Sequence, residues 1–316
     1  MPKVILAYLE GIFYSPSKLT CTLMASVLGN RGSHDQFTRL LSHAASVGQT
    51  LLTAIVFRLF GELKGGFLII DDTVIKKQFS RSIQNVFWVY SSKETRSVLG
   101  MNFVLLTWSN GTVTIPLAFR VWRNDKKTKI DLAIQLLRHA RHTLRLSPDY
   151  VLFDSFYGAG DVLKMLDRYG WKYVTQFKKN RKLDGVQLQR CKRNPYWLAK
   201  GALTSGSEVT IAKHGKNYFA TNDHSLDSAG IRALYKKRWP IEEVFRFLHS
   251  KLGMDDCQAR SAKAQANHIA LCMVAHVLIE RERIDRKCSR YYVKRILSLK
   301  RERFNFVAMK TISQCA

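Results

Sequence analysis

The segment Gly66-Phe67-Leu68-Ile69-Ile70-Asp71-Asp72-Thr73 is a short apolar run that ends in two adjacent aspartates. Four consecutive apolar residues are typical of a strand that is buried on both faces. The run Tyr150-Val151-Leu152-Phe153-Asp154 repeats the pattern, with an aspartate directly after it. A third acidic residue, Glu242, lies in a basic helical segment. Two carboxylates at strand ends and one on a helix are what two hard metal ions need, and such a site suits phosphoryl transfer on nucleic acid.

The charge of the chain points to a polyanionic partner. Its 316 residues include 51 Lys and Arg against 24 Asp and Glu, which gives a formal net charge of +27. Such an excess favours nucleic acid, since contacts with phosphates release counterions and dominate affinity. A disordered coat on RNA or DNA is disfavoured, because 46% of the residues are hydrophobic and 11% are aromatic, enough for a packed core.

The cysteines and the hydropathy indicate neither secretion nor a membrane anchor. None of the six cysteines belongs to a C-x-x-C pair or has the spacing to histidine of a zinc finger. Reduced thiols in a cytoplasmic protein are therefore expected. The N-terminus has no signal-peptide pattern, and no apolar stretch is long enough to span a bilayer.

Hydrophobic patterning predicts an α/β domain in the middle of the chain. Asn110-Gly111 joins two β-rich segments as a hairpin, and a polar, basic loop precedes them. The expected elements are strands at 67–70, 102–108, 113–121, 151–153 and 171–177, and helices at 130–144 and 160–169. This order is that of a ribonuclease-H-like mixed sheet flanked by helices. Its first and fourth strands are neighbours, so Asp72 and Asp154 are expected to face each other across one groove.

Three regions are expected around this domain core. The sequence predicts an N-terminal helical region 1–64, a catalytic domain 65–265 with a β-rich insertion at about 178–224, and a basic helical region 266–316. The joint Gly29–Gly32 suits either a helix-turn-helix-like DNA reader or a helical cap on the next domain. The basic C-terminal helix is interpreted as a phosphate-binding face, with a second subunit as the alternative partner.

Two local features leave alternatives open. In the insertion, Tyr196 and Trp197 lie beside Lys192 and Arg193, and an exposed aromatic ring among basic residues can stack on an unpaired base. The alternative is that Trp197 fills the small core of the insertion. Pro240 interrupts the helical pattern just before Glu242, so either the helix kinks there or a new one begins with this proline in its first turn.

Three motifs in order resemble DDE transposases of bacterial insertion sequences. They are Asp72-Thr73, Phe153-Asp154 and the segment from Tyr235 through Arg238 to Glu242. The resemblance is to the group with a Y-x2-R-x3-E-x6-K signature and a β-insertion between the second Asp and the Glu. It covers roughly residues 66 to 255 and includes the hairpin and the insertion in their expected places.

The resemblance implies a ribonuclease-H-like catalytic domain in which Asp72, Asp154 and Glu242 bind two divalent ions. These would be Mg²⁺, with Mn²⁺ as a substitute, and the chemistry would be cleavage of DNA and transfer of 3′-hydroxyls. Strand alternation lets only one of Asp71 and Asp72 enter the groove, and the resemblance favours Asp72. It likewise favours Glu242 over Glu243. The implied partners are transposon ends, target DNA and a second copy of the chain in a synaptic homodimer, on the bacterial nucleoid.

The DNA-contacting residues follow the same resemblance. Tyr235 and Arg238 are expected to contact phosphates near the cleaved end, and a nucleophilic role for Tyr235 is disfavoured because carboxylate–metal chemistry needs no covalent intermediate. The lysine of the signature should lie seven residues after the glutamate, where this chain has His249. The terminal cation is therefore His249, Arg246 or the displaced Lys251.

Three functions remain for these residues. The first is a cut-and-paste transposase. The second is a ribonuclease-H-like nuclease or resolvase without strand transfer, which would need fewer DNA-holding parts than this chain has. The third is a repurposed DNA-binding protein, which the intact acidic residues disfavour.

Overall fold

The computed structural model describes residues 2–15, 18–43, 47–91, 94–191 and 194–300. The predictions that involve Lys192, Arg193 and residues 301–316 lie outside the described residues. No helix in the described ranges is long and apolar enough to cross a membrane.

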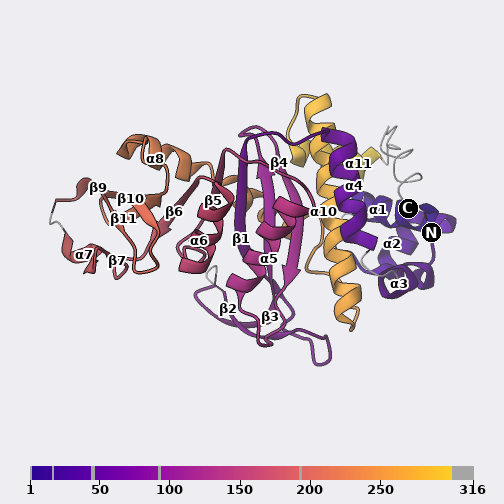
Figure 1. The fold of residues 1–316 in the computed structure, drawn as a ribbon. Coiled ribbons are helices and arrows are strands. Elements are labelled where there is room, and N and C mark those ends of the chain that lie inside the picture. The colour runs from indigo at the N-terminus through magenta and orange to yellow at the C-terminus, as the bar shows by residue number, and fades with distance from the viewer. Residues whose placement is uncertain (1, 16–17, 44–46, 92–93, 192–193, 301–316) are drawn as a thin grey trace.

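A mixed sheet forms the centre of the molecule (Figure 1). Its strands follow the order β2-β3-β1-β5-β6-β11-β10-β9, and β4 pairs with the second half of β3. β1 is antiparallel to β3 and parallel to β5, so the first and fourth predicted strands are neighbours as expected. The strands are β1 (Phe67–Lys76), β2 (Phe87–Ser91), β3 (Arg96–Ser109), β4 (Thr114–Val121), β5 (Tyr150–Phe153), β6 (Tyr173–Phe177), β9 (Tyr196–Ala202), β10 (Glu208–His214) and β11 (Asn217–Thr221). A short hairpin of β7 (Lys182–Leu183) and β8 (Val186–Gln187) stands apart from the sheet.

Helices cover both faces of the sheet and one of its sides. Those of the catalytic region are α5 (Lys129–His142), α6 (Gly160–Tyr169), α7 (Leu188–Cys191), α8 (Ser228–Lys236) and α9 (Pro240–Lys251). The ring of Phe103 in β3 packs on that of Phe245 in α9, with ring centroids 6.2 Å apart. On the other face, the first residue of α5 contacts β1. The ribonuclease-H-like fold class is thus present, with α5 and α9 on opposite faces.

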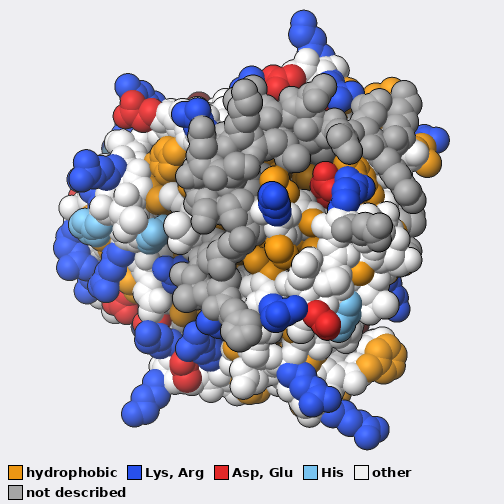
Figure 2. All heavy atoms as spheres, turned by 90° about the vertical axis from the view of Figure 1, so that its right-hand side faces the viewer, with side chains coloured by type: hydrophobic (Ala, Val, Ile, Leu, Met, Phe, Trp, Pro, Cys, Tyr) orange, Lys and Arg blue, Asp and Glu red, His pale blue; other side chains and the backbone are white. Residues whose placement is uncertain are grey.

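The two ends of the chain build one helical layer beside β4. It contains α1 (Pro2–Tyr14), α2 (Cys21–Leu28), α3 (His34–His43), α4 (Val47–Phe60), α10 (Ala262–Asp285) and α11 (Arg290–Lys300). The Tyr8 hydroxyl lies 2.7 Å from Nδ1 of His268, and the Asn267 amide donates to the Leu41 carbonyl at 2.9 Å. The N-terminal helices therefore pack on α10, as a cap would. Lys and Arg side chains spread around the rim of this face, with few acidic side chains among them (Figure 2).

The hairpin predicted at Asn110-Gly111 is confirmed and joins β3 to β4. The side chain of Asn110 accepts from the backbone N–H groups of Thr112 and Val113, at 3.0 and 2.9 Å. Gly111 has a φ of 91°, a conformation that residues with a Cβ rarely adopt. This local chemistry explains why the sequence predicted the turn correctly.

One expectation about strands needs correction, and one open question is resolved. The segment expected as a basic loop contains β2, an edge strand in which Trp88 and Tyr90 are exposed and Val89 is buried. The β strands of the insertion extend the central sheet, because β11 pairs with β6. At Pro240 a new helix begins, with the proline in its first turn.

Candidate active site

β1 carries two adjacent aspartates into the middle of the sheet. Leu68, Ile69 and Ile70 are fully buried between β3 and β5, and Asp71 and Asp72 follow them within the strand. Successive side chains of a strand point to opposite faces of the sheet. The two carboxylates therefore lie on different faces, each with its own set of partners.

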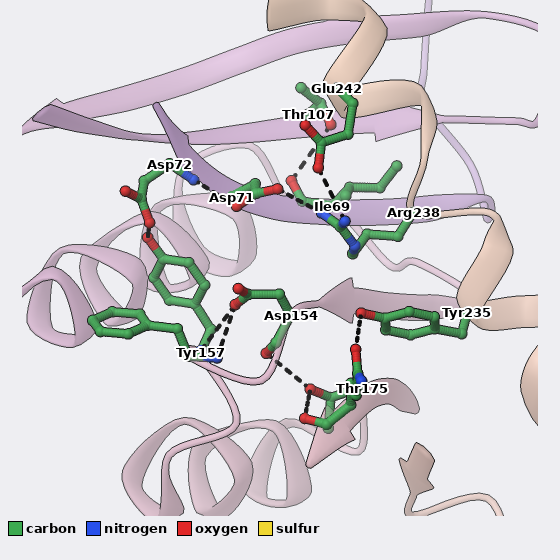
Figure 3. A network of polar contacts seen from close by, with 12 residues as sticks. Ile69, Asp71, Asp72, Thr107, Asp154, Tyr157, Thr175, Tyr235, Arg238 and Glu242 are labelled. Carbon is green, nitrogen blue, oxygen red and sulfur yellow. Dashed lines mark hydrogen bonds and ion pairs between the residues drawn. The ribbon is translucent and has the colours of Figure 1, made fainter. Parts of the chain in front are cut away.

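The Asp71 carboxylate lies on the face of α9. Its Oδ2 accepts from Nη1 of Arg238 at 2.5 Å, while Nη2 of the same guanidinium donates to Oε1 of Glu242 at 3.1 Å (Figure 3). Arg238 lies in the tight turn between α8 and α9, one helical turn before Glu242, which is why it can reach both carboxylates. One half-buried arginine thus joins Asp71 to Glu242.

Asp154 lies beside Asp71 because of the strand register. The parallel pairing of β1 with β5 ends at Ile70 and Phe153, and the two aspartates follow directly. Oδ1 of Asp154 accepts from the backbone N–H groups of Phe156 and Tyr157, at 2.9 and 3.3 Å. These bonds hold the carboxylate where β5 turns toward α6. In the described part of the chain, the Asp154 carboxylate takes part in no ion pair.

Charge is poorly balanced among these three acids. Burial raises the pKa of Asp71 to about 7, even though the Arg238 guanidinium opposes the shift, and Asp154 and Glu242 add to it. Burial also raises the pKa of Asp154, against the hydrogen bonds that its carboxylate accepts from the backbone. Three carboxylates share one guanidinium. A further positive charge at this place would therefore be favourable.

Asp72, the residue expected in the groove, has a full set of partners on the opposite face. Its Oδ2 accepts from Nζ of Lys129 and from Nδ2 of Asn102, both at 2.8 Å, and its Oδ1 accepts from the Tyr157 hydroxyl at 2.7 Å. Lys129 is the first residue of α5, whose start is fixed by a capping box at Thr128. Asp72 therefore connects β1 to α5 and to the loop before α6.

The donor chemistry around Asp71 fits divalent metal ions. Hard cations prefer carboxylate oxygens, and Asp71, Asp154 and Glu242 supply them with a deficit of positive charge. Within the described ranges, no group of three or more Asp, Glu, His or Cys side chains is arranged to hold one ion. The fit therefore rests on donor type and charge, and not on a preformed ligand shell.

The remaining residues of the expected signature lie near this cluster. The Tyr235 hydroxyl donates to Oε1 of Gln176 at 3.2 Å, and the Arg238 guanidinium lies 5.9 Å from the centre of the Tyr235 ring. Arg246 and Lys251 are exposed on α9. Trp197, by contrast, is only 8% exposed and packs against Tyr218, as the alternative interpretation had it. The aromatic residue that β9 presents to solvent is Tyr196, which is 59% exposed.

His249 is held between two side chains two turns after Glu242. Its Nε2 lies 3.0 Å from Oγ1 of Thr73, and its Nδ1 lies 2.8 Å from Oδ1 of Asp255. Nζ of Lys77 donates to the Asp255 carbonyl at 2.7 Å and fixes the loop that carries this carboxylate. Thr73 is on the same face of β1 as Asp71, so His249 lies next to the acidic cluster.

Sequence reasoning missed several members of this site. They are Thr73 and Asp255 as partners of His249, and Lys129, Asn102 and Tyr157 as partners of Asp72. Asp71 is a further member, which the resemblance placed outside the groove. Of these, only Asp71 had a sequence signal, its position at the end of the buried run.

Comparisons with known proteins identify the family to which the chain belongs. The family model of the transposase DDE domain matches residues 62–278. A putative transposase for insertion sequence element IS4SA, from Synechocystis sp. (strain ATCC 27184 / PCC 6803 / Kazusa), is 26% identical over 128 residues, which are 37% of this chain and 36% of that protein. The chain thus spans about a third of the length of this curated relative.

A solved structure is similar over almost the whole chain. It is a cryo-EM structure of the piggyBac transposase synaptic complex with hairpin DNA, with a TM-score of 0.56 and 12% sequence identity, and the match covers 99% of this chain and 76% of that one. The likeness concerns the fold, which in that protein is ribonuclease-H-like. Proteins with this family's domain generally use divalent metal ions. Since the family model covers more than half of the sequence, the chain belongs to the family of transposase DDE domains.

Proposed function

We propose that this protein is a DNA transposase that cleaves DNA at the ends of an insertion sequence and joins the freed 3′-hydroxyls to target DNA. The observation that carries the proposal is the cluster of Asp71, Asp154 and Glu242, in which Arg238 forms the ion pairs found among the described residues. This acidic cluster belongs to a chain whose formal net charge is +27. A chain with such an excess of positive charge suits a substrate that is a polyanion.

The proposal assigns the first acidic position to Asp71 in place of Asp72. Asp71 shares Arg238 with Glu242 and faces α9, whereas Asp72 is engaged by Lys129 on the far side of β1. Asp71, Asp154 and Glu242 would then hold two divalent ions, Mg²⁺ by preference and Mn²⁺ as a substitute. When bound, such ions activate the attacking oxygen and stabilise the leaving oxygen.

The residues around the cluster position these acids. Arg238 holds the carboxylates of Asp71 and Glu242 together, and two backbone N–H groups fix the carboxylate of Asp154. Tyr235 and Arg238 as phosphate contacts, and Arg246, His249 and Lys251 as sources of the terminal cation, stay predictions. The low exposure of Arg238, 13% of its side chain, argues that positioning is its main role in the absence of DNA.

The proposed function also includes the partners, the assembly and the location of the protein. The partners are transposon ends and target DNA, the active assembly is a homodimer, and the place of action is the bacterial nucleoid in the cytoplasm. Support for DNA as partner comes from the charge of the chain and from the basic rim of the helical layer (Figure 2).

The test is a cleavage and joining assay on linear DNA that carries the element's own ends. Wild type and Asp154→Asn are compared, each with Mg²⁺ and with EDTA. Metal-dependent cleavage with joined products, lost in the variant, is the expected result. Cleavage without joining would replace the proposal by a nuclease. Tight DNA binding without cleavage in either protein would replace it by a DNA-binding protein.

A further inference from the structure

A basic cleft lies at the side of the sheet, between β4, α5 and α10. It has a volume of about 1040 Å³, and its walls include the end of β4, the loop before α5 and the first turns of α10. We call it the β4 cleft. Its charged and aromatic lining includes Arg120, Trp122, Arg123, Asp125, Lys127 and Lys263.

The walls of the β4 cleft are fixed by hydrogen bonds between elements. Gln49 of α4 covers the free edge of β4, because its amide donates to the Leu117 carbonyl at 3.0 Å and accepts from the Phe119 N–H at 3.4 Å. On the opposite side, the Gln84 side chain accepts from the first N–H of α10, at Ala262, at 2.9 Å. The cleft is therefore a built feature of the fold and not a gap between loosely packed segments.

Three cations of the cleft have no acidic partner among the described residues. Within the described ranges, neither Arg120, Arg123 nor Lys127 forms an ion pair with a carboxylate. Burial lowers the pKa of Arg120. The acid of the cleft, Asp125, already accepts from the backbone N–H of Lys127 at 2.9 Å. An arginine that is partly buried without an anion is stabilised by an anionic ligand.

The β4 cleft is linked to Asp72, on the face of the sheet opposite the acidic cluster. The backbone of Asn102 accepts from the Trp122 N–H at 2.8 Å, and its side chain donates to Asp72 at 2.8 Å. Lys127 in the cleft is two residues from Lys129, which also pairs with Asp72. One residue of β3 thus links the wall of the cleft to Asp72, the neighbour of Asp71 in β1.

We propose that the β4 cleft binds the phosphodiester backbone of a DNA strand. The inference rests on the proposed function and deepens it, by naming where part of the DNA is held. Arg120 and Arg123 contact successive phosphates, and Lys127 guides the strand toward Lys129. A polyanion is the occupant that this charge selects, because uncompensated guanidinium groups pair strongly with phosphate oxygens.

The experiment measures binding of a fluorescently labelled DNA duplex by anisotropy across a series of salt concentrations, with EDTA present so that no DNA is cut. Wild type is compared with Arg120→Gln/Arg123→Gln. A second double variant, Arg123→Gln/Lys127→Gln, changes only exposed side chains and so guards against misfolding of the first. The matched control is Lys164→Gln/Arg168→Gln on the exposed face of α6, which removes the same charge.

Each lost phosphate contact should reduce the slope of log affinity against log salt by about 0.9. Both cleft variants are expected to bind more weakly and to lose about 2 from this slope, while the control keeps the slope of wild type. Cleft variants that behave like the control would overturn the inference and leave the proposed function standing, and changed self-association in them would assign the cleft to a protein. If the wild type itself does not bind DNA, both the inference and the proposed function fail.

Discussion

Asp71 and Asp72 are neighbours in β1 whose carboxylates lie on opposite faces of the central sheet. Arg238 contacts the first and Lys129 contacts the second. The pair therefore divides two tasks between adjacent positions. Asp71 faces the helix that carries Glu242, and Asp72 fastens β1 to α5.

The first prediction separates these tasks. Asp71→Asn should reduce DNA cleavage to background while the protein stays folded. Asp72→Asn should keep metal-dependent cleavage but cost about 1–3 kcal/mol of unfolding free energy, because Lys129 loses its charged partner. Cleavage rates and urea unfolding curves measure the two effects, with Glu243→Gln on the exposed side of α9 as the control. A folded but inactive Asp72→Asn together with an active Asp71→Asn would return the role to Asp72.

The second prediction concerns His249 and Asp255. Asp255 orients the His249 imidazole toward Thr73. Removing either His249 or Asp255 should therefore disturb the same hydrogen-bonded arrangement. His249→Gln and Asp255→Asn should lower the cleavage rate to a similar degree, and the double variant should be little worse than either one. The expected coupling energy is on the order of 1 kcal/mol.

Arg246→Gln on the same helix supplies the comparison for this cycle. Arg246 is exposed and does not contact Asp255, so its effect should add to that of Asp255→Asn. Additive effects of His249 and Asp255 would show that the hydrogen-bonded pair does not act as one unit.

The sequence predicted those parts of the fold that depend on local patterns. The buried runs before Asp71 and Asp154 and the turn at Asn110 have local causes, and all three are present. β2 escaped prediction although Phe87 to Tyr90 is an apolar run, because the basic residues on either side of it indicated a loop. The sequence did not predict that the insertion extends the central sheet, because the pairing of β11 with β6 depends on tertiary structure.

The candidate site was predictable only in part for the same reason. Alternation shows that one aspartate of β1 faces each side, but which side carries Glu242 depends on the packing of α9 against Phe103. Lys129 pairs with Asp72 from 57 positions away, and no sequence pattern predicts this ion pair. Only the three-dimensional arrangement identifies Asp71 as the partner of Glu242 through Arg238.

The third prediction is that divalent ions stabilise the protein. Mg²⁺ or Mn²⁺ should raise the thermal midpoint relative to EDTA, because an ion that binds only the native state adds stability, about 2.7 kcal/mol at a hundredfold excess over its dissociation constant. Asp154→Asn should lose most of this gain, and Glu208→Gln, an exposed acid of β10, should keep it. Equal ionic strength in all samples removes general salt effects. An identical gain in wild type and Asp154→Asn would argue against ions at the acidic cluster.

The fourth prediction concerns acid stability, which two buried histidines of α10 should control. Burial lowers the pKa of His276 to about 3 and that of His268 to about 4. In the unfolded chain an imidazole takes up a proton near pH 6.5. Between these pH values the unfolded state binds more protons than the native state. The contribution of the two neutral imidazoles to the unfolding free energy is therefore complete above about pH 6.5 and is lost as the pH falls.

His276→Gln tests this relationship at one site. A glutamine amide can still donate to the Thr114 carbonyl, which His276 contacts at 3.2 Å, but it cannot be protonated. From pH 7 to pH 5, the unfolding free energy of wild type should fall by about 2 kcal/mol more than that of the variant. Urea unfolding at a series of pH values measures the difference, and His34→Gln, with an imidazole that is 54% exposed, should follow wild type. Parallel curves for wild type and His276→Gln would mean that the buried imidazole is not the acid-sensitive group.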